Sequence, residues 1–309
     1  MKKYCCVLTV LLLVFVMLLS GCGDADPAPD KAADMVDFEQ YESDDITDIE
    51  QVVLSGTLAE RCVTYRFSYV SDANSIGAYI SIPKALIDSG EKGKCILYNR
   101  GGNSNIGFLE DDTTARVCAA TDRIVVASQY RGVNGKGSRD EFGGKDVNDV
   151  IKLIDLCETR FSFVDMDDFC TCGVSRGGMM TYLAAARDDR IKRIISISGV
   201  CDLTACYNDR EDMRDILEYS IGGTPDDLPE EYESRSAVCW PERITVPVLM
   251  IHSKGDVQVS FSQAEELSQL FEDNGIDCTF IVHDDDVHGP HTEDAAMIRE
   301  WLETGSAEE

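Results

Sequence analysis

The sequence has 309 residues, 44% of them hydrophobic, so it can bury an apolar core as one large domain or two small ones. It carries 57 acidic and 28 basic residues, a formal net charge of -29. This excess of acidic residues argues against a protein that binds nucleic acid and against one that binds anionic lipid electrostatically. Both kinds of binding need clustered lysine and arginine.

The N-terminus has the layout of an export signal. Lys2 and Lys3 precede an apolar run over residues 7–19, which is shorter than the roughly 20 residues that cross a membrane. The run leads into Leu19-Ser20-Gly21-Cys22, which resembles the lipobox of bacterial lipoproteins. The resemblance implies that residues 1–21 are a signal peptide, that Cys22 is lipidated, and that the protein is anchored to a bacterial membrane outside the cytoplasm. An ordinary signal peptide with an incidental Cys22 is the alternative.

Residues 22–50 are predicted to be a disordered tether. Positions 24–50 contain eleven acidic residues, one lysine and two prolines. Such a segment buries too little apolar surface to offset the entropy lost on ordering. An acidic tail that binds a partner is the alternative.

Ten of the 13 cysteines follow Cys22, and no two of them have the C-x-x-C spacing. We expect small buried thiols rather than a zinc cluster. One or two disulfides remain open for an exported protein, but their pairing cannot be deduced from spacing.

Residues 51–309 alternate short apolar runs with amphipathic stretches. Two β-branched and aromatic runs, 62–70 and 75–82, predict an antiparallel pair of strands. The later runs lack polar alternation, as expected for strands that a parallel sheet buries on both faces. These runs cover residues 95–98, 124–128, 169–174, 194–198, 248–252 and 279–282.

Amphipathic spacing predicts helices over residues 146–157, 177–187 and 262–271, and a closing helix capped by Thr292. Such alternation predicts one doubly wound α/β domain with a mostly parallel sheet. The irregular stretch 204–242 is predicted to be a small helical insertion over one end of that sheet.

The sequence Gly173-Val174-Ser175-Arg176-Gly177 follows an apolar strand and opens a predicted helix. A serine on such a sharp turn is lifted above the sheet, and the small flanking residues make the turn sterically possible. We therefore expect Ser175 to be a nucleophile, with the Arg176 N–H contributing to an oxyanion hole. A glycine-rich turn without chemistry is the alternative.

A serine nucleophile on this turn is followed in the chain by an acid and then by a histidine. Asp256 lies in the turn after strand 248–252 and is the expected acid, with Asp202 as its rival. Of the four histidines, His288 lies in the loop before the last helix, where it can reach both partners. The other three are less suited to be the base: His252 and His283 end strands, and His291 starts the last helix.

The loop after strand 95–98 reads Asn99-Arg100-Gly101-Gly102 and can supply the second oxyanion donor. Paired glycines let backbone N–H groups approach a substrate closely. We expect this donor from Arg100 or Gly101, and a simple turn is the alternative.

These motifs together resemble the catalytic domain of the prolyl oligopeptidase family of serine peptidases, which has the α/β-hydrolase fold. The resemblance covers residues 55–305, where the motifs occur in the same order as in the family. They are Tyr98-Asn99-Arg100-Gly101-Gly102, Tyr130-Arg131-Gly132, Glu141-Phe142-Gly143-Gly144-Lys145-Asp146, Gly173-Val174-Ser175-Arg176-Gly177-Gly178, Tyr232-Glu233-Ser234-Arg235-Ser236, Asp256 and His288-Gly289.

The resemblance implies Ser175 as nucleophile, Asp256 as orienting acid and His288 as base, with the Arg176 N–H and the Arg100 loop as oxyanion hole. Arg100 stands where some relatives carry a tyrosine donor, and Ser253 stands where a glycine is usual. We expect no β-propeller between the tether and the matching region, so the peptide specificity of large relatives does not carry over.

The sequence therefore predicts a serine hydrolase that cleaves peptide bonds through an acyl-enzyme intermediate, as a serine-type peptidase. The alternatives are a carboxylesterase or dienelactone-hydrolase-like esterase, and an inactive surface-binding protein on a hydrolase fold. Neither an H-E-x-x-H motif nor a glycine-rich phosphate loop occurs, so we expect no metal and no cofactor.

Overall fold

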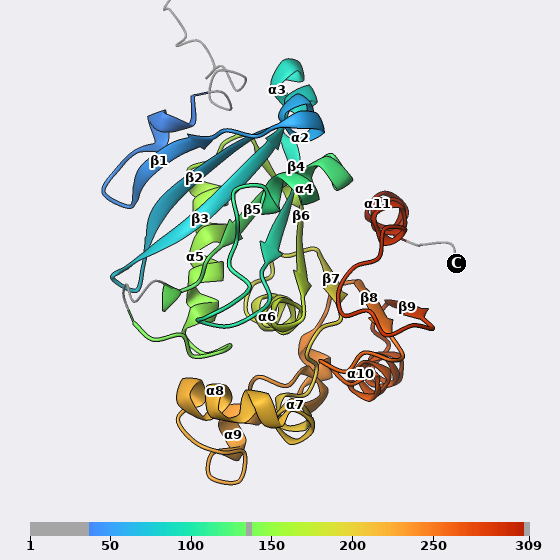
Figure 1. The fold of residues 1–309 in the computed structure, drawn as a ribbon. Coiled ribbons are helices and arrows are strands. Elements are labelled where there is room, and N and C mark those ends of the chain that lie inside the picture. Colours follow the sequence, from blue (N-terminus) through green and yellow to red (C-terminus); the bar gives the residue numbers. More distant parts are fainter. Residues whose placement is uncertain (1–36, 134–137, 306–309) are drawn as a thin grey trace, which may run out of the picture. The chain divides into compact units, whose positions relative to one another are not determined.

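The computed structural model describes residues 37–133 and 138–305 (Figure 1). The predicted signal peptide over residues 1–21, the lipidation site Cys22 and the tether up to residue 36 lie outside the described residues. Among those described, no helix is long and apolar enough to cross a membrane.

The described residues form a nine-stranded sheet with strand order β1-β2-β3-β5-β4-β6-β7-β8-β9. Pairing is antiparallel from β1 through β3 to β5 and parallel from there on, which confirms the predicted α/β fold class. The strands are β1 (Ile46–Val52), β2 (Cys62–Ser71), β3 (Asn74–Pro83), β4 (Gly93–Asn99), β5 (Ile124–Ser128), β6 (Val164–Val174), β7 (Arg193–Ile197), β8 (Val248–Ser253) and β9 (Cys278–His283).

Helices cover both faces of the sheet because successive strand residues point to opposite sides. Leu97 of β4 belongs to a core shared with α5, α6 and α10, whereas its neighbour Ile96 packs in a second core with α4 and α11. The helices outside the insertion are α2 (Gly56–Arg61), α3 (Lys84–Ser89), α4 (Thr113–Thr121), α5 (Asp146–Thr159), α6 (Arg176–Ala185), α10 (Phe261–Asp273) and α11 (Asp294–Thr304).

The predicted helical insertion between β7 and β8 is confirmed. Figure 1 shows its helices grouped beyond one end of the sheet. It comprises α7 (Leu203–Asp209), α8 (Glu211–Ile221), α9 (Pro229–Glu233) and the 3-10 turns η3 (Ala237–Cys239) and η4 (Pro241–Arg243).

The prediction of a disordered tether up to residue 50 is wrong for residues 37–50. They form the 3-10 turn η1 (Phe38–Tyr41) and most of β1, which pairs with β2. Phe38 and Tyr41 are buried, and their rings lie 5.1 and 5.3 Å from that of Phe161. These two aromatic anchors, with the buried Ile46, hold an otherwise acidic segment against the domain.

The ten described cysteines are free thiols, and eight of them are buried. Cys278 is half-buried and Cys239 is exposed, so the prediction of core thiols fits eight positions. Burial raises the pKa of Cys170 and of Cys172 to about 12, which keeps these thiols protonated at neutral pH.

The register of the parallel strands brings their carboxyl ends together. Asn99 of β4 pairs with Gly173 of β6, and Val174 pairs with Ile197 of β7, which pairs in turn with Ile251 of β8. The loops that leave these strands therefore meet at one edge of the sheet, where α/β proteins bind their ligands.

Candidate active site

The turn between β6 and α6 holds Ser175 in a strained backbone conformation. Its φ is +59° and its ψ is -124°, a region that L-residues rarely occupy. A Cβ on Gly173 would overlap the carbonyl oxygen of Gly177, and one on Gly177 would overlap that of Asn99. Only glycine fits at both positions, so the motif has the predicted sharp turn.

Ser175 and His288 line one cavity of about 290 Å³ at the carboxyl edge of the sheet. Gly101 from the loop after β4 lines the same cavity, as do Gln258 and Val259 from the loop after β8. The insertion contributes Cys206, Arg210 and Met213 to its wall. Segments distant in the sequence thus converge on the serine.

His288 is oriented by Asp256. Its Nδ1 lies 2.8 Å from Asp256 Oδ2, and the side chain of Asp256 is fully buried. Because an ionised carboxylate only accepts hydrogen bonds, Nδ1 carries the hydrogen and Nε2 of the neutral ring is left as a base. Asp256 Oδ1 accepts from the N–H groups of Gln258 and Val259 at 2.8 and 3.1 Å.

Asp256 stays ionised despite its burial. Burial by itself would raise its pKa, but the side chains of His252 and His288 and the two backbone N–H groups donate to it and hold the pKa well below its usual range. His252 Nε2 lies 3.4 Å from Asp256 Oδ2 and 2.9 Å from the Val259 carbonyl oxygen. His252, at the end of β8, therefore helps to hold the Asp256 carboxylate in its ionised form.

The other candidates for the acid and the base, Asp202, His283 and His291, do not line the serine cavity. The carboxylate of Asp202 caps α7, accepting from the N–H groups of Thr204 and Ala205. His283 and His291 bond to acidic residues, Asp294 and Asp285 respectively, and neither lines the cavity. Thr292 does not cap the last helix, since α11 begins two residues later.

The backbone N–H groups of Arg176 and Gly101, the oxyanion donors expected from the sequence, belong to residues that line the serine cavity. That of Arg176 starts α6, where the first N–H groups of a helix lack an intrahelical acceptor. Gly101 lies against the nucleophile, so that a Cβ there would be 3.4 Å from the Cβ of Ser175. The structure thus brings together the predicted Gly101, Arg176 and Ser175.

The sequence does not decide whether the Arg100 side chain takes part in the oxyanion hole. In the structure this side chain donates hydrogen bonds to backbone carbonyl oxygens and is not among the residues that line the serine cavity. Its Nε donates to the Gln129 carbonyl oxygen at 2.9 Å and its Nη1 to that of Gly101 at 3.0 Å. The guanidinium also lies 4.9 Å from the Tyr130 ring centre. Burial, with Arg176 nearby, lowers the pKa of Arg100 to about 10.

Beneath the serine turn lies a buried ion network that sequence reasoning missed. The Arg176 guanidinium donates to both carboxylate oxygens of Asp140 at 2.7 Å and to Asp146 at 2.5 Å, and it lies 4.5 Å from the Phe142 ring centre. Burial opposes the charge of Arg176, but the two aspartates hold its pKa above the ordinary value. The sequence signal for this network is Asp146 in the Glu141–Asp146 motif, but nothing in the spacing of that motif pairs it with Arg176.

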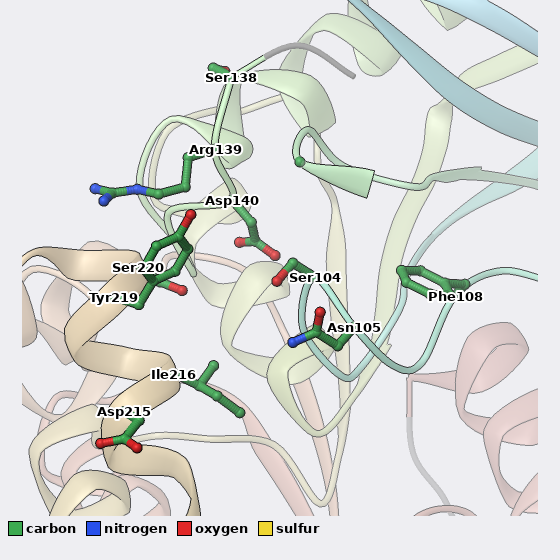
Figure 2. A pocket seen from close by; sticks show the side chains of 11 residues that line it. Ser104, Asn105, Phe108, Ser138, Arg139, Asp140, Asp215, Ile216, Tyr219 and Ser220 are labelled. Carbon is green, nitrogen blue, oxygen red and sulfur yellow. The ribbon is translucent and has the colours of Figure 1, made fainter. Parts of the chain in front are cut away.

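A second, larger cavity of about 900 Å³ adjoins the first. Figure 2 shows its wall, to which α8 of the insertion contributes Ile216 and Tyr219. Ser104 and Asn105 come from the loop after β4, whose residues 101–103 and 106–107 line the serine cavity. One loop therefore separates the two cavities.

Residues 110–304 match the sequence profile of the prolyl oligopeptidase family of peptidases. The chain belongs to the prolyl oligopeptidase family. It is therefore a serine hydrolase, and the α/β-hydrolase fold expected from the resemblance is confirmed.

Similar proteins extend this result. The uncharacterized peptidase YtmA of Bacillus subtilis is 33% identical over 179 residues, which are 56% of this chain and 69% of YtmA. The probable dipeptidyl-peptidase 5 of Aspergillus flavus is 25% identical over 75% of this chain, a match that covers 33% of that protein.

Two solved structures share the fold. The acylaminoacyl peptidase of Pyrococcus horikoshii has a TM-score of 0.68 at 19% identity, covering 81% of this chain and 43% of that one. Acetyl xylan esterase 1 of Thermoanaerobacterium sp. has a TM-score of 0.62 at 17% identity, covering 86% of this chain and 92% of that one. The match thus covers less than half of the dipeptidyl-peptidase and of the acylaminoacyl peptidase, but nearly all of the esterase.

Proposed function

We propose that this protein is a serine peptidase that cleaves peptide bonds through an acyl-enzyme intermediate. The observation that carries the proposal is the cavity that joins the strained Ser175 to His288, which is hydrogen-bonded to the buried Asp256. A serine hydroxyl needs a base to become a nucleophile, and an acid behind the imidazole makes that base effective.

In this reaction His288 Nε2 takes the proton of Ser175 Oγ as the oxygen attacks the carbonyl carbon of the substrate. The N–H groups of Gly101 and Arg176 stabilise the negative charge that develops on the carbonyl oxygen. The imidazolium then protonates the leaving amine, and the acyl group remains on Ser175. Water, activated by the same histidine, releases the acid, while Asp256 stabilises the imidazolium without taking a proton.

Peptides are the first choice of substrate because the matching family and the relatives named above are peptidases. Ester hydrolysis is the second candidate, since the match to acetyl xylan esterase 1 covers nearly the whole of that enzyme. An inactive binding protein is disfavoured by the intact set of serine, histidine, acid and glycine loop.

A substrate panel distinguishes the first two candidates. Aminoacyl and dipeptidyl p-nitroanilides are compared with acyl esters on the purified protein, with Ser175→Ala as the background control. We expect turnover of amides that this substitution abolishes. Turnover of esters alone would refute the peptidase assignment and favour the esterase.

We also propose that the protein is lipid-anchored through Cys22 to a bacterial membrane, on the outer side of the cytoplasmic membrane. The support is the Leu19-Ser20-Gly21-Cys22 sequence behind a basic and apolar start. The expressed protein should partition into the detergent phase of Triton X-114, and Cys22→Ala should move it to the aqueous phase. Equal partitioning of both forms would contradict the anchor.

A further inference from the structure

Two histidines and an aspartate gather where the last strand gives way to the last helix. His283 ends β9, Asp294 begins α11, and His291 lies in the segment between them. Each offers one ligand atom, and these atoms lie within 4.8 Å of one another. None of the three lines the serine cavity.

The spacing of the ligand atoms suits a small metal ion. His283 Nε2 lies 2.8 Å from Asp294 Oδ1, and His291 Nδ1 lies 3.6 Å from Asp294 Oδ2. Zinc bonds of about 2.0–2.2 Å to nitrogen and oxygen place tetrahedral ligands about 3.3–3.6 Å apart. The separation from His291 Nδ1 to Oδ2 falls at the upper end of this range, and that from His283 Nε2 to Oδ1 is shorter. Small rotations of the His283 and Asp294 side chains would therefore bring one carboxylate oxygen and both nitrogens to the distances that a single ion requires.

A carboxylate orients His291 in the way that carboxylates hydrogen-bonded to metal-binding histidines do. Its Nε2 lies 2.7 Å from Asp285 Oδ2, which fixes the hydrogen on that nitrogen and leaves a lone pair on Nδ1. Within the described part of the chain, the buried Nδ1 has no hydrogen-bond partner. It faces the Asp294 carboxylate. Two atoms with lone pairs face each other favourably only when a cation or a proton lies between them.

We propose that His283, His291 and Asp294 bind a divalent transition-metal ion of the Zn²⁺ class, with water as the fourth ligand. Imidazole nitrogen with one carboxylate is the donor set of such ions, whereas Ca²⁺ and Mg²⁺ prefer oxygen alone. Asp294 is fully buried, and the two histidine side chains are 15% and 11% exposed, so the ion has access from solvent. Binding replaces the hydrogen between His283 Nε2 and Asp294 and releases a proton.

The ion would fasten together the two ends of the segment that carries His288. Since it binds the folded state, it should raise the melting temperature with metal concentration. Both binding and melting are measured without substrate, so their outcome does not depend on the reaction proposed above.

The test titrates ZnCl₂ and MgCl₂ into the metal-free full-length protein by calorimetry. We expect one Zn²⁺ per chain, no comparable Mg²⁺ binding, and a loss of zinc affinity of at least about 100-fold in His283→Gln and His291→Gln. Asp285→Asn, which keeps all three ligands, should lose about 10–100-fold. The exposed neighbour Glu293 provides the control, and Glu293→Gln should bind zinc as the wild type does.

Cobalt substitution distinguishes metal binding at the proposed site from metal binding at the thiols. Co²⁺ in the proposed site should give visible bands without the near-ultraviolet charge-transfer band of a cobalt–thiolate bond. No stoichiometric zinc binding by the wild type, or undiminished binding in Asp285→Asn and in those ligand variants whose circular dichroism is native, would overturn the proposal. A cobalt–thiolate band in the wild type would also overturn it, by placing the ion at the cysteines.

Discussion

Asp256 combines deep burial with a full set of hydrogen-bond donors. Burial would raise the pKa of its carboxyl, yet the donors from His252, His288 and two backbone N–H groups outweigh burial and lower it. The carboxylate is therefore ionised at any pH at which the enzyme is expected to work. An acid in this state orients the imidazole and offsets its positive charge during acyl transfer.

Asp256→Asn should reduce kcat by about 10³–10⁴-fold with a small change in KM, because the amide favours the wrong tautomer of His288. Steady-state kinetics on the best substrate of the panel measure this, with circular dichroism as the folding control. A loss of less than about tenfold would contradict the role given to Asp256.

The same variant has a defined effect on stability at low pH. The pKa of Asp256 in the folded protein lies below the value of about 3.9 in an unfolded chain, so its ionised form stabilises the fold above that pH. This contribution is lost as the pH falls towards the folded-state pKa. The free energy of unfolding in urea should therefore differ less between wild type and Asp256→Asn at pH 3 than at pH 5; a wider gap at pH 3 would contradict this.

The proximity of Ser175, Asp256 and His288 could be predicted because the sharp turn and the scarcity of histidine leave few candidates. Ser175 lies between an apolar strand and a helix, and only four histidines follow it. The direction of the Arg100 guanidinium could not be predicted, because it is set by the Gln129 carbonyl oxygen and the Tyr130 ring in another loop. Likewise, no motif spacing pairs His291 with Asp285.

At the scale of elements, the connection from β6 to α6 depends on the absence of a side chain at Gly177. A Cβ there would overlap the backbone oxygen of Asn99, which no rotamer change relieves. Gly177→Ala should lower kcat/KM by about 100-fold through displacement of Ser175 and destabilise the fold by about 1–3 kcal/mol. Kinetics and urea unfolding measure both.

Gly77→Ala is the matched control for this substitution. Gly77 lies in β3, where a Cβ would make an ordinary contact, 3.5 Å from Gln129 Cγ. Both the activity and the stability of this variant should stay close to those of the wild type. Equal effects of the two alanines would refute the steric account of the turn.

Removing only the cation from the buried ion network below the serine turn should strongly lower the free energy of unfolding. Arg176→Met leaves Asp140 and Asp146 buried without their cation, since the three side chains are at most 2% exposed. We expect a loss of about 3–5 kcal/mol in the free energy of unfolding in urea. The exposed pair of Arg116 with Asp112 is the control, and Arg116→Met should cost at most about 1 kcal/mol. Similar losses in both variants would contradict the account.

The elements differ in how far the sequence predicts them. Strands buried on both faces are predicted by continuous apolar runs, and all the expected ones are present. The short helices α2, α3 and α4 contain only six to nine residues, too few for a clear periodicity. The ordered structure of residues 37–50 could not be predicted from the local sequence. It depends on a contact with Phe161, which lies more than 100 positions further along the chain.

At the scale of the whole molecule, the cysteines report how completely the domain is packed. Eight of the ten described thiols are buried, whereas Cys239 is exposed and Cys278 is half-buried. Alkylation of the native protein should label Cys239 first and Cys278 more slowly, and the other eight only in denaturant. Peptide mapping by mass spectrometry identifies the sites. Rapid labelling of Cys95 or Cys170 in the native protein would contradict the packing of the core.

The proposed peptidase activity requires Ser175 to be an activated nucleophile. Treatment of the purified protein with a fluorophosphonate probe, followed by peptide mass spectrometry, tests this most directly. We predict a single covalent adduct on Ser175, abolished in Ser175→Ala and strongly reduced in His288→Ala. A folded wild-type protein that remains unlabelled, or a label that persists in Ser175→Ala, would contradict it.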